Sequence, residues 1–131
     1  MLAVLQKTID ATCFSIDLYQ SLFDKINDNE KRKQQLQLFL KHGQKQYQLF
    51  QYLHFLMNGA SYEHKPCHIV HDSLHDLIDA ALFNEMKKIN GYYELFTSLT
   101  GTKKQVTMQA LQHSLQCAET LLEMVEEVNL E

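Results

Sequence analysis

Five side chains that commonly bind metal ions lie within a span of twelve residues. They are His64, Cys67, His68, His71 and His75. Imidazole nitrogen and thiolate sulfur are preferred ligands of zinc and copper, and His71 and His75 have the i, i+4 spacing that places two side chains on one helix face. The run does not follow the paired, fixed spacing of a zinc motif. The competing interpretation is therefore a polar connection with solvated histidines.

A second candidate set interrupts otherwise apolar stripes near the middle of the predicted helices. Its members are Gln46, Glu85 and Cys117. Together they could hold a single zinc-like ion, although a good zinc site has three or four strong donors and an amide is a weak one. The competing interpretation is a satisfied core, in which Glu85 accepts hydrogen bonds from Gln46, Thr12 or Tyr19, or pairs with Lys88 one turn along, because an unpaired buried carboxylate is costly.

Four segments, from about residues 2–26, 30–58, 73–100 and 102–128, have apolar residues at helical spacing, and none alternates as a strand does. Asn58-Gly59 predicts a left-handed helix end, Ser73 with Asp76 predicts an N-cap, and Thr102 predicts another. Links between bundled helices usually span about 2–8 residues, so the longer link before Ser73 indicates a crossover. We predict an all-α four-helix bundle made of two helical hairpins joined by a long crossover between the second and third helices.

Composition narrows the class of protein. The 131 residues are 45% hydrophobic and 21% charged, which predicts one globular domain over residues 1–131. No apolar run approaches the ~20 residues that span a bilayer, and the N-terminus turns polar too early for a signal peptide. Three widely spaced cysteines favour a reducing compartment, so we expect a cytoplasmic protein with no membrane partner. A net charge of −4 and a single arginine, Arg32, argue against nucleic acid.

The two halves of the chain resemble each other. Residues 16–23 match residues 89–96 at a shift of 73, and they share Ile, Tyr, Leu and Phe. The second and fourth helices match more weakly at a shift of 71, where His42 falls on His113 and Gln46 on Cys117. This pattern indicates two related helical hairpins.

In the order of its helices, its loop lengths and its mid-helix polar positions, nearly the whole chain resembles the ferritin-like superfamily, in particular the small rubrerythrin-type bundles. The resemblance implies two iron or manganese ions in the core. They would be held by a Glu on the first and third helices and by a Glu-x-x-His on the second and fourth. Carried over position by position, these ligands fall on Thr12, Gly43, Gln46, Glu85, Ser114 and Cys117.

Only Glu85 keeps the residue type that this resemblance implies at its position. One carboxylate cannot neutralise two divalent ions, so we expect the oxidase, peroxidase and iron-storage chemistries of the family to be absent. No cofactor is expected, and a single ion at one of the two candidate sets is the alternative. Gly43 would then allow close approach of a neighbouring helix or filling by a larger side chain.

Hemerythrin-like domains offer a weaker resemblance. His54, His71 and His75 match part of their ligand pattern, but the first helix has no histidine and Asn58 stands where a Glu is needed. Catalysis by a nucleophile has little support, because Cys13 and Cys117 lie on or beside apolar stripes and no phosphate-binding glycine loop exists. The acidic stretch over residues 123–131 is expected to be solvated or frayed.

The second helix gives one positive indication of function. From Tyr47 to Met57 apolar side chains circle nearly the whole helix, which a helix with one solvent face does not show. Either the crossover covers this outer face or a second copy of the chain does, with Tyr47, Tyr52 and Phe55 at the interface. We therefore expect a non-enzymatic homodimeric interaction or regulatory module, with a protein partner as an option. A metal-binding or redox protein is the alternative.

Overall fold

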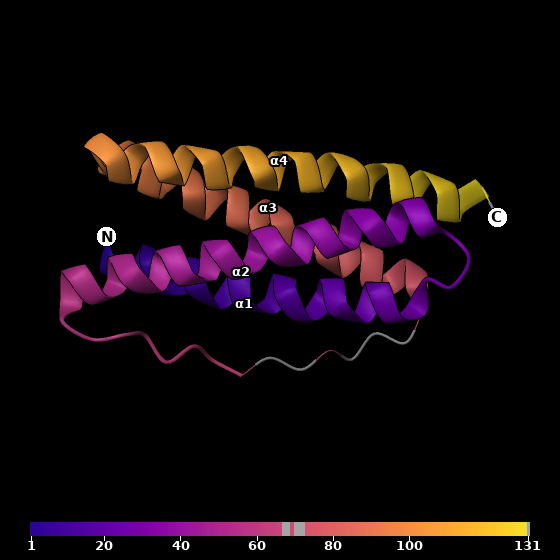
Figure 1. Cartoon of the computed structure of the whole chain (residues 1–131), viewed down its shortest axis with the longest axis horizontal. Helices are drawn as coiled ribbons and strands as arrows, with labels where there is room; N and C mark the ends of the chain where they lie inside the picture. Colours follow the sequence, from indigo (N-terminus) through magenta and orange to yellow (C-terminus); the bar gives the residue numbers. More distant parts are fainter. Residues whose placement is uncertain (67–68, 70–72, 131) are drawn as a thin grey trace.

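The computed structural model describes residues 1–66, 69 and 73–130, and in them the chain forms four helices (Figure 1). They are α1 (Leu2–Lys25), α2 (Glu30–Asn58), α3 (Leu74–Ser98) and α4 (Gly101–Leu130). No strand occurs in these residues. The predicted all-α four-helix bundle is confirmed.

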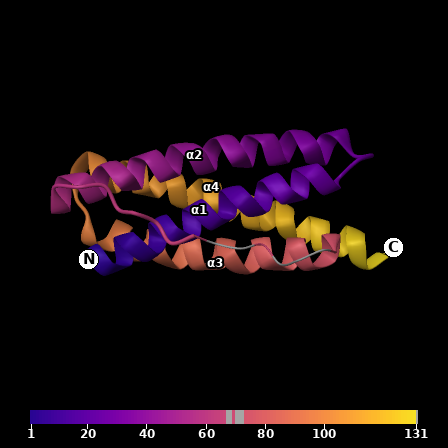
Figure 2. The same cartoon turned by 90° about the horizontal axis from the view of Figure 1, so that it is seen from below.

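The helices pair as two hairpins, α1 with α2 and α3 with α4, and the hairpins meet mainly through α1 and α3. Contact between α2 and α4 is much sparser. Helix α2 ends at the end of the bundle where α1 begins, and α3 starts at the opposite end, so α2 and α3 run in the same direction (Figures 1 and 2). The connection between them therefore joins opposite ends of the bundle, as its length predicts. None of the four helices is long and apolar enough to cross a membrane, within the described residues.

Helix ends follow the sequence signals closely. Gly59 has φ +78° and donates its N–H to the Phe55 carbonyl, which is the left-handed end that Asn58-Gly59 predicts. The Ser73 hydroxyl accepts a hydrogen bond of 3.0 Å from the Asp76 N–H. The predicted cap at Thr102 is wrong by two residues, because α4 already begins at Gly101, whose φ of +63° lies in the turn between α3 and α4.

The first part of the crossover, residues 60–66, is fixed to α1 and α2, and we call it the strap. The Gln51 side chain bonds both backbone groups of Tyr62, accepting from its N–H at 2.8 Å and donating to its carbonyl at 2.7 Å. The Asp10 carboxylate accepts from the Tyr62 hydroxyl and from the Lys65 N–H, both at 2.9 Å. Two helices thus determine the path of a segment that has no regular structure.

Two apolar clusters fill the core. One contains Leu18, Leu22, Leu36 and Leu121, and the other contains Leu5, Ile9, Phe50 and Leu95. Between them lies a layer of buried polar side chains, which we call the polar layer. Its members are Thr12, Ser15, Tyr19, Gln46, Glu85, Lys88, Tyr92, Ser114 and Cys117.

Two glycines allow close contact between neighbouring helices. A Cβ atom at Gly43 would lie 3.0 Å from Ile16 Cγ1, so the Ile16 side chain fills the space beside this glycine. A Cβ atom at Gly91 would lie 2.5 Å from Thr8 Oγ1, so the Thr8 side chain of α1 packs directly against α3 at this glycine. Of the two alternatives for Gly43, close approach of a helix or filling by a larger side chain, the contact with Ile16 corresponds to the second.

Candidate functional site

An ion pair lies at the centre of the polar layer. Glu85 and Lys88 are one turn apart on α3 and are 0% and 1% exposed. The Lys88 ammonium lies 3.0 Å from Glu85 Oε1, without hydrogen-bond geometry at that oxygen, and donates to Oε2 at 3.3 Å. Ser15 donates to the same Oε2 at 3.3 Å, and the Tyr19 hydroxyl donates to it as well. The only carboxylate of the layer is therefore occupied by the protein itself.

The titratable groups around this ion pair keep their protons. Burial, followed by the charge of Glu85, raises the pKa of Cys117 to about 12 and raises that of Tyr19 well above its usual value. Burial also raises the pKa of Tyr92 to about 12. Burial alone would lower the pKa of Lys88, but its interactions with Tyr92, Glu85 and Cys117 outweigh burial and raise it, and near neutral pH the Glu85 carboxylate is the one of these partners that is negatively charged. Near neutral pH the thiol and both phenols are uncharged, and Lys88 carries the positive charge.

Two tyrosines connect the hairpins across this layer in equivalent ways. Tyr19 and Tyr92 are separated by 73 residues, the shift that relates the two halves of the sequence, and so are Thr12 and Glu85. Tyr19 donates to Glu85, and the Tyr92 hydroxyl lies 2.8 Å from the Thr12 hydroxyl. The repeat in the sequence therefore corresponds to a repeated contact between helices.

The same shift relates Ser15 to Lys88. Both side chains contact Glu85, but only the copy on α3 carries a charge. The sequence pattern indicated Lys88 as one of several partners of Glu85 but did not indicate Ser15. Extending the repeat by one residue toward the N-terminus pairs Ser15 with Lys88, whereas Tyr92 already lies in the matched residues 89–96 as the equivalent of Tyr19.

The six positions at which the resemblance implies ligands all lie in the polar layer or directly against it. Thr12, Gln46, Glu85, Ser114 and Cys117 are buried, and Gly43 is in contact with Ile16. Gln46 accepts a hydrogen bond of 2.8 Å from Tyr92 rather than donating one to Glu85, and Thr12 also bonds Tyr92. Of the four predicted partners of Glu85, Tyr19 and Lys88 contact it, whereas Gln46 and Thr12 bond Tyr92 instead. The buried Ser114 hydroxyl has no hydrogen-bond partner in the described part of the chain.

Metal-ligating side chains do not converge in the polar layer. Across residues 1–66, 69 and 73–130, no group of three or more His, Cys, Asp or Glu side chains is placed to hold an ion. Glu85 and Cys117 do share one layer, as predicted, but the Lys88 ammonium occupies the carboxylate. Gln46 hydrogen-bonds Tyr92 at 2.8 Å and makes a longer contact of 3.5 Å with the Ala110 carbonyl.

The histidine-rich candidate set is only partly described. Cys67, His68 and His71 lie outside the described residues. His64 Nδ1 lies 3.0 Å from the Tyr47 hydroxyl, and His75 Nδ1 lies 3.2 Å from an Asp79 carboxylate oxygen one turn along α3. Each of these two histidines therefore has a partner within its own part of the chain.

His54, which prompted the hemerythrin comparison, anchors the strap. Its Nδ1 lies 2.7 Å from the Ala60 carbonyl, so Nδ1 must carry the proton and donate it. Its Nε2 then accepts from the Gln6 side-chain amide at 3.2 Å. Both ring nitrogens are used in the fold.

His42 and His113 stack where α2 meets α4. Their ring centroids are 3.9 Å apart and the planes differ by 7°. Burial, followed by the charges of His113, Lys45, Lys41 and Lys88, lowers the pKa of His42. Two protonated rings in this position would repel each other across the sparsest helix contact in the bundle.

Stability is expected to fall between pH 7.5 and pH 5 because of this pair. The pKa of His42 is lower in the folded chain than the ordinary value near 6.5, so the unfolded chain binds more protons in this range. The stability that the neutral His42 ring contributes is fully present above about pH 6.5, and it is lost as the pH falls through the pKa of His42 in the folded chain. Urea midpoints at both pH values measure it. His42→Gln and His113→Gln should each lose less stability on acidification than the parent chain, and an equal loss in all three would contradict the prediction.

Two side chains of the acidic C-terminal stretch are exposed to solvent, as expected, but they also form ion pairs that the sequence did not indicate. Arg32 on α2 is buried and forms ion pairs with Glu123 and Glu127 of α4, and it also donates to Gln35 at 2.8 Å. These contacts lower the pKa of Glu127, chiefly through its hydrogen bond with Arg32. The single arginine therefore joins α2 and α4, which otherwise have few contacts. The charge pattern of one helix cannot predict such a pair, because the partners lie on different helices.

The outer face of α2 is covered in part. Tyr47 packs edge-on against His64 of the strap, whereas Tyr52 is 61% exposed and Phe55 is 51% exposed. Leu56 and Met57 are 47% and 44% exposed. We call Tyr52, Phe55, Leu56 and Met57 the α2 patch. Of the three residues predicted at the interface, the crossover therefore covers only Tyr47 and leaves Tyr52 and Phe55 exposed.

Comparisons with known proteins give no assignment. No protein-family model matches the chain, and neither a curated protein nor a solved structure matches it significantly. The site must therefore be interpreted from its own geometry.

Proposed function

We propose that this chain is a ferritin-like bundle in which an internal ion pair stands in place of a di-metal centre, and that it works as a non-enzymatic, homodimeric interaction or regulatory module in the cytoplasm. The observation that carries the proposal is the Lys88 ammonium beside Glu85 at full burial. An ammonium at this point supplies the positive charge that a metal ion would otherwise supply to the carboxylate, and it repels a divalent cation.

The polar layer also gives no support to a reaction. Its thiol and phenols are protonated near neutral pH, and its members are buried. A nucleophile or general base must reach a substrate in its reactive protonation state. Mutual satisfaction of these groups supports a structural role.

Metal content of purified protein tests this part of the proposal. The chain, purified without chelator and without an affinity tag, should contain iron, manganese and zinc far below one equivalent. Its thermal midpoint should be the same with and without EDTA. One equivalent of any of these ions, or a lower midpoint in EDTA, would favour the metal-binding alternative. The His64→Gln/His75→Gln and Cys117→Ser variants would then show which set binds the ion.

The α2 patch supports self-association. Residues 46–62 contain no Asp, Glu, Lys or Arg, although 28 of the 131 residues are of these types. In a two-fold symmetric interface each residue lies near its own copy, so like charges would repel and an uncharged surface suits self-contact. Exposed aromatic and long aliphatic side chains at a helix end supply the apolar area. A second copy of this chain is therefore the partner that we propose.

Phe55→Glu is expected to convert a dimer into a monomer, because it places two carboxylates near each other across the symmetric contact. Sedimentation velocity over a range of concentrations should give a dimer dissociation constant at least about a hundredfold higher for Phe55→Glu than for the parent chain. Phe83→Glu is the matched control, since Phe83 is 63% exposed on α3 and lies outside the α2 patch. A parent chain that stays monomeric at the highest soluble concentration, or equal effects of both variants, would overturn the dimer.

A further inference from the structure

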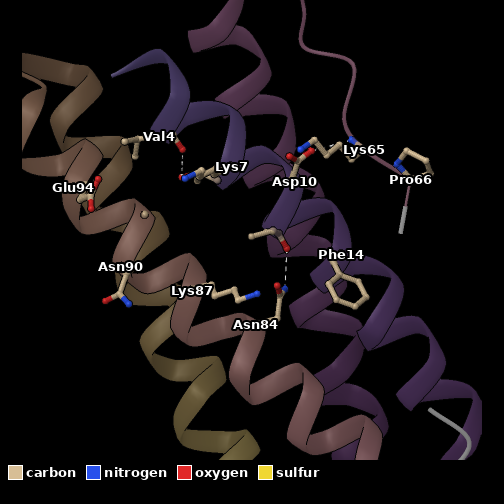
Figure 3. A pocket seen from close by; sticks show the side chains of 13 residues that line it. Val4, Lys7, Asp10, Phe14, Lys65, Pro66, Asn84, Lys87, Asn90 and Glu94 are labelled. Carbon is tan, nitrogen blue, oxygen red and sulfur yellow. Dashed lines mark hydrogen bonds between the residues drawn. The ribbon is translucent and has the colours of Figure 1, made fainter. Parts of the chain in front are cut away.

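A groove of about 580 Å³ runs between α1 and α3 and is bordered on a third side by the strap. Its volume is within the range of small-molecule sites. Figure 3 shows α1 and α3 side by side with side chains of the groove between them, and Lys65 and Pro66 of the strap next to Asp10. The close contact of Gly91 with Thr8 forms its floor.

Positive charge enters the groove from all three sides. Lys7 comes from α1, Lys65 from the strap and Lys87 from α3, and the Lys87 side chain extends from α3 toward α1 (Figure 3). None of these three ammoniums forms an ion pair with a carboxylate in the described residues. Lys87 instead lies over the Phe83 ring, 4.9 Å from its centroid.

The lining of the groove has more cationic than anionic side chains, three lysines against two carboxylates. Asp10 and Glu94 are its two carboxylates. Both oxygens of Asp10 already accept hydrogen bonds, from Tyr62 and from the Lys65 backbone. These bonds hold the Asp10 carboxylate toward the strap but leave its charge in place, so the described lining has a formal charge of +1.

Apolar side chains form much of the remaining lining. Val4, Ala11 and Phe14 line the α1 side, and Pro66 faces them from the strap. Because the Asp10 contacts fix the strap to α1, Pro66 and Lys65 are held in place rather than left to an unanchored loop. An apolar wall next to several cations is suited to a ligand with an apolar body and an anionic end.

We propose that this groove binds a small organic anion, with its apolar body against Phe14 and Pro66 and its carboxylate or phosphate held by Lys7 and Lys87. The site lies on the α1–α3 face and uses no residue of the α2 patch or of the polar layer. It therefore goes beyond the proposed function and can fail or succeed independently of it.

The experiment titrates the full chain with 1-naphthoate and with 1-naphthyl phosphate and follows backbone amide chemical shifts by NMR. Saturable shifts are expected in residues 4–14 and 84–94. The affinity for the neutral 1-naphthamide should be lower by about tenfold or more, because this compound lacks the charge that the lysines recognise. Tighter binding of one of the two anions would identify the ligand as a carboxylate or as a phosphate.

Lys7→Gln/Lys87→Gln should weaken binding of the preferred anion by about tenfold or more. Lys41→Gln/Lys103→Gln removes the same charge from exposed positions on α2 and α4 and should change binding less than about twofold. All four lysines are exposed, so both double variants should fold, which circular dichroism checks. Shifts confined to another surface, equal binding of the neutral amide, equal loss in both double variants, or no saturable shift would each overturn the proposal.

Discussion

Lys88→Met is expected to lower the free energy of unfolding by about 3–5 kcal/mol. The substitution keeps an unbranched apolar stem of similar length but removes the only positive charge beside a carboxylate that is 0% exposed. The remaining hydrogen bonds from Tyr19 and Ser15 do not replace an ammonium, and a buried unpaired charge carries its full desolvation cost.

Urea unfolding followed by circular dichroism measures this effect. Glu85→Gln alone should also destabilise the chain, since it leaves the Lys88 ammonium buried without a counter-charge. The double variant Glu85→Gln/Lys88→Met should be less destabilised than the sum of the two single variants by at least about 2 kcal/mol. Additive losses, or a loss below about 1 kcal/mol for Lys88→Met, would show that the pair does not hold the layer together.

Gly91→Val is expected to destabilise the chain by about 3 kcal/mol through overpacking. Glycine is a poor helix former, so a gain of a few tenths of a kcal/mol in helix propensity partly offsets the loss. The gain is small beside the clash, because the first added carbon would lie 2.5 Å from Thr8 Oγ1 and valine adds two more methyl groups. The branched Thr8 side chain is stiff and donates to the Val4 carbonyl at 2.8 Å, so it cannot turn away freely.

Thermal and urea midpoints of Gly91→Val compared with Asn90→Val test this effect at adjacent positions of α3. Asn90 is exposed, so its substitution should change stability by less than about 0.5 kcal/mol. Adding Thr8→Ala should restore at least half of the stability lost in Gly91→Val, because it removes the oxygen that the new side chain meets. If Thr8→Ala does not restore stability, the destabilisation by Gly91→Val does not come from the clash with Thr8.

The four helices, their approximate ends and their connection were all predictable from local patterns in the sequence. Apolar spacing predicted each helix, while Gly59 and Ser73 marked the ends of the crossover and its length ruled out a tight hairpin. These features are local, since capping, turn chemistry and periodicity depend on residues within a few positions of one another. The positions of the polar interruptions were also predictable, because periodicity assigns a residue to the buried face.

The pairing of the buried polar groups depends on how the helices pack against one another and is not visible in the sequence. Periodicity places Tyr92, Gln46 and Thr12 on inward faces, but the rotation and height of each helix against its neighbours decide which atoms come within 3 Å. The same holds for Arg32, whose partners on α4 are more than 90 residues away in the chain. It also holds for the α2 patch and for the groove between α1 and α3. Whether an outer face is covered, and whether two helices diverge enough to leave a space, depends on the packing of the whole chain.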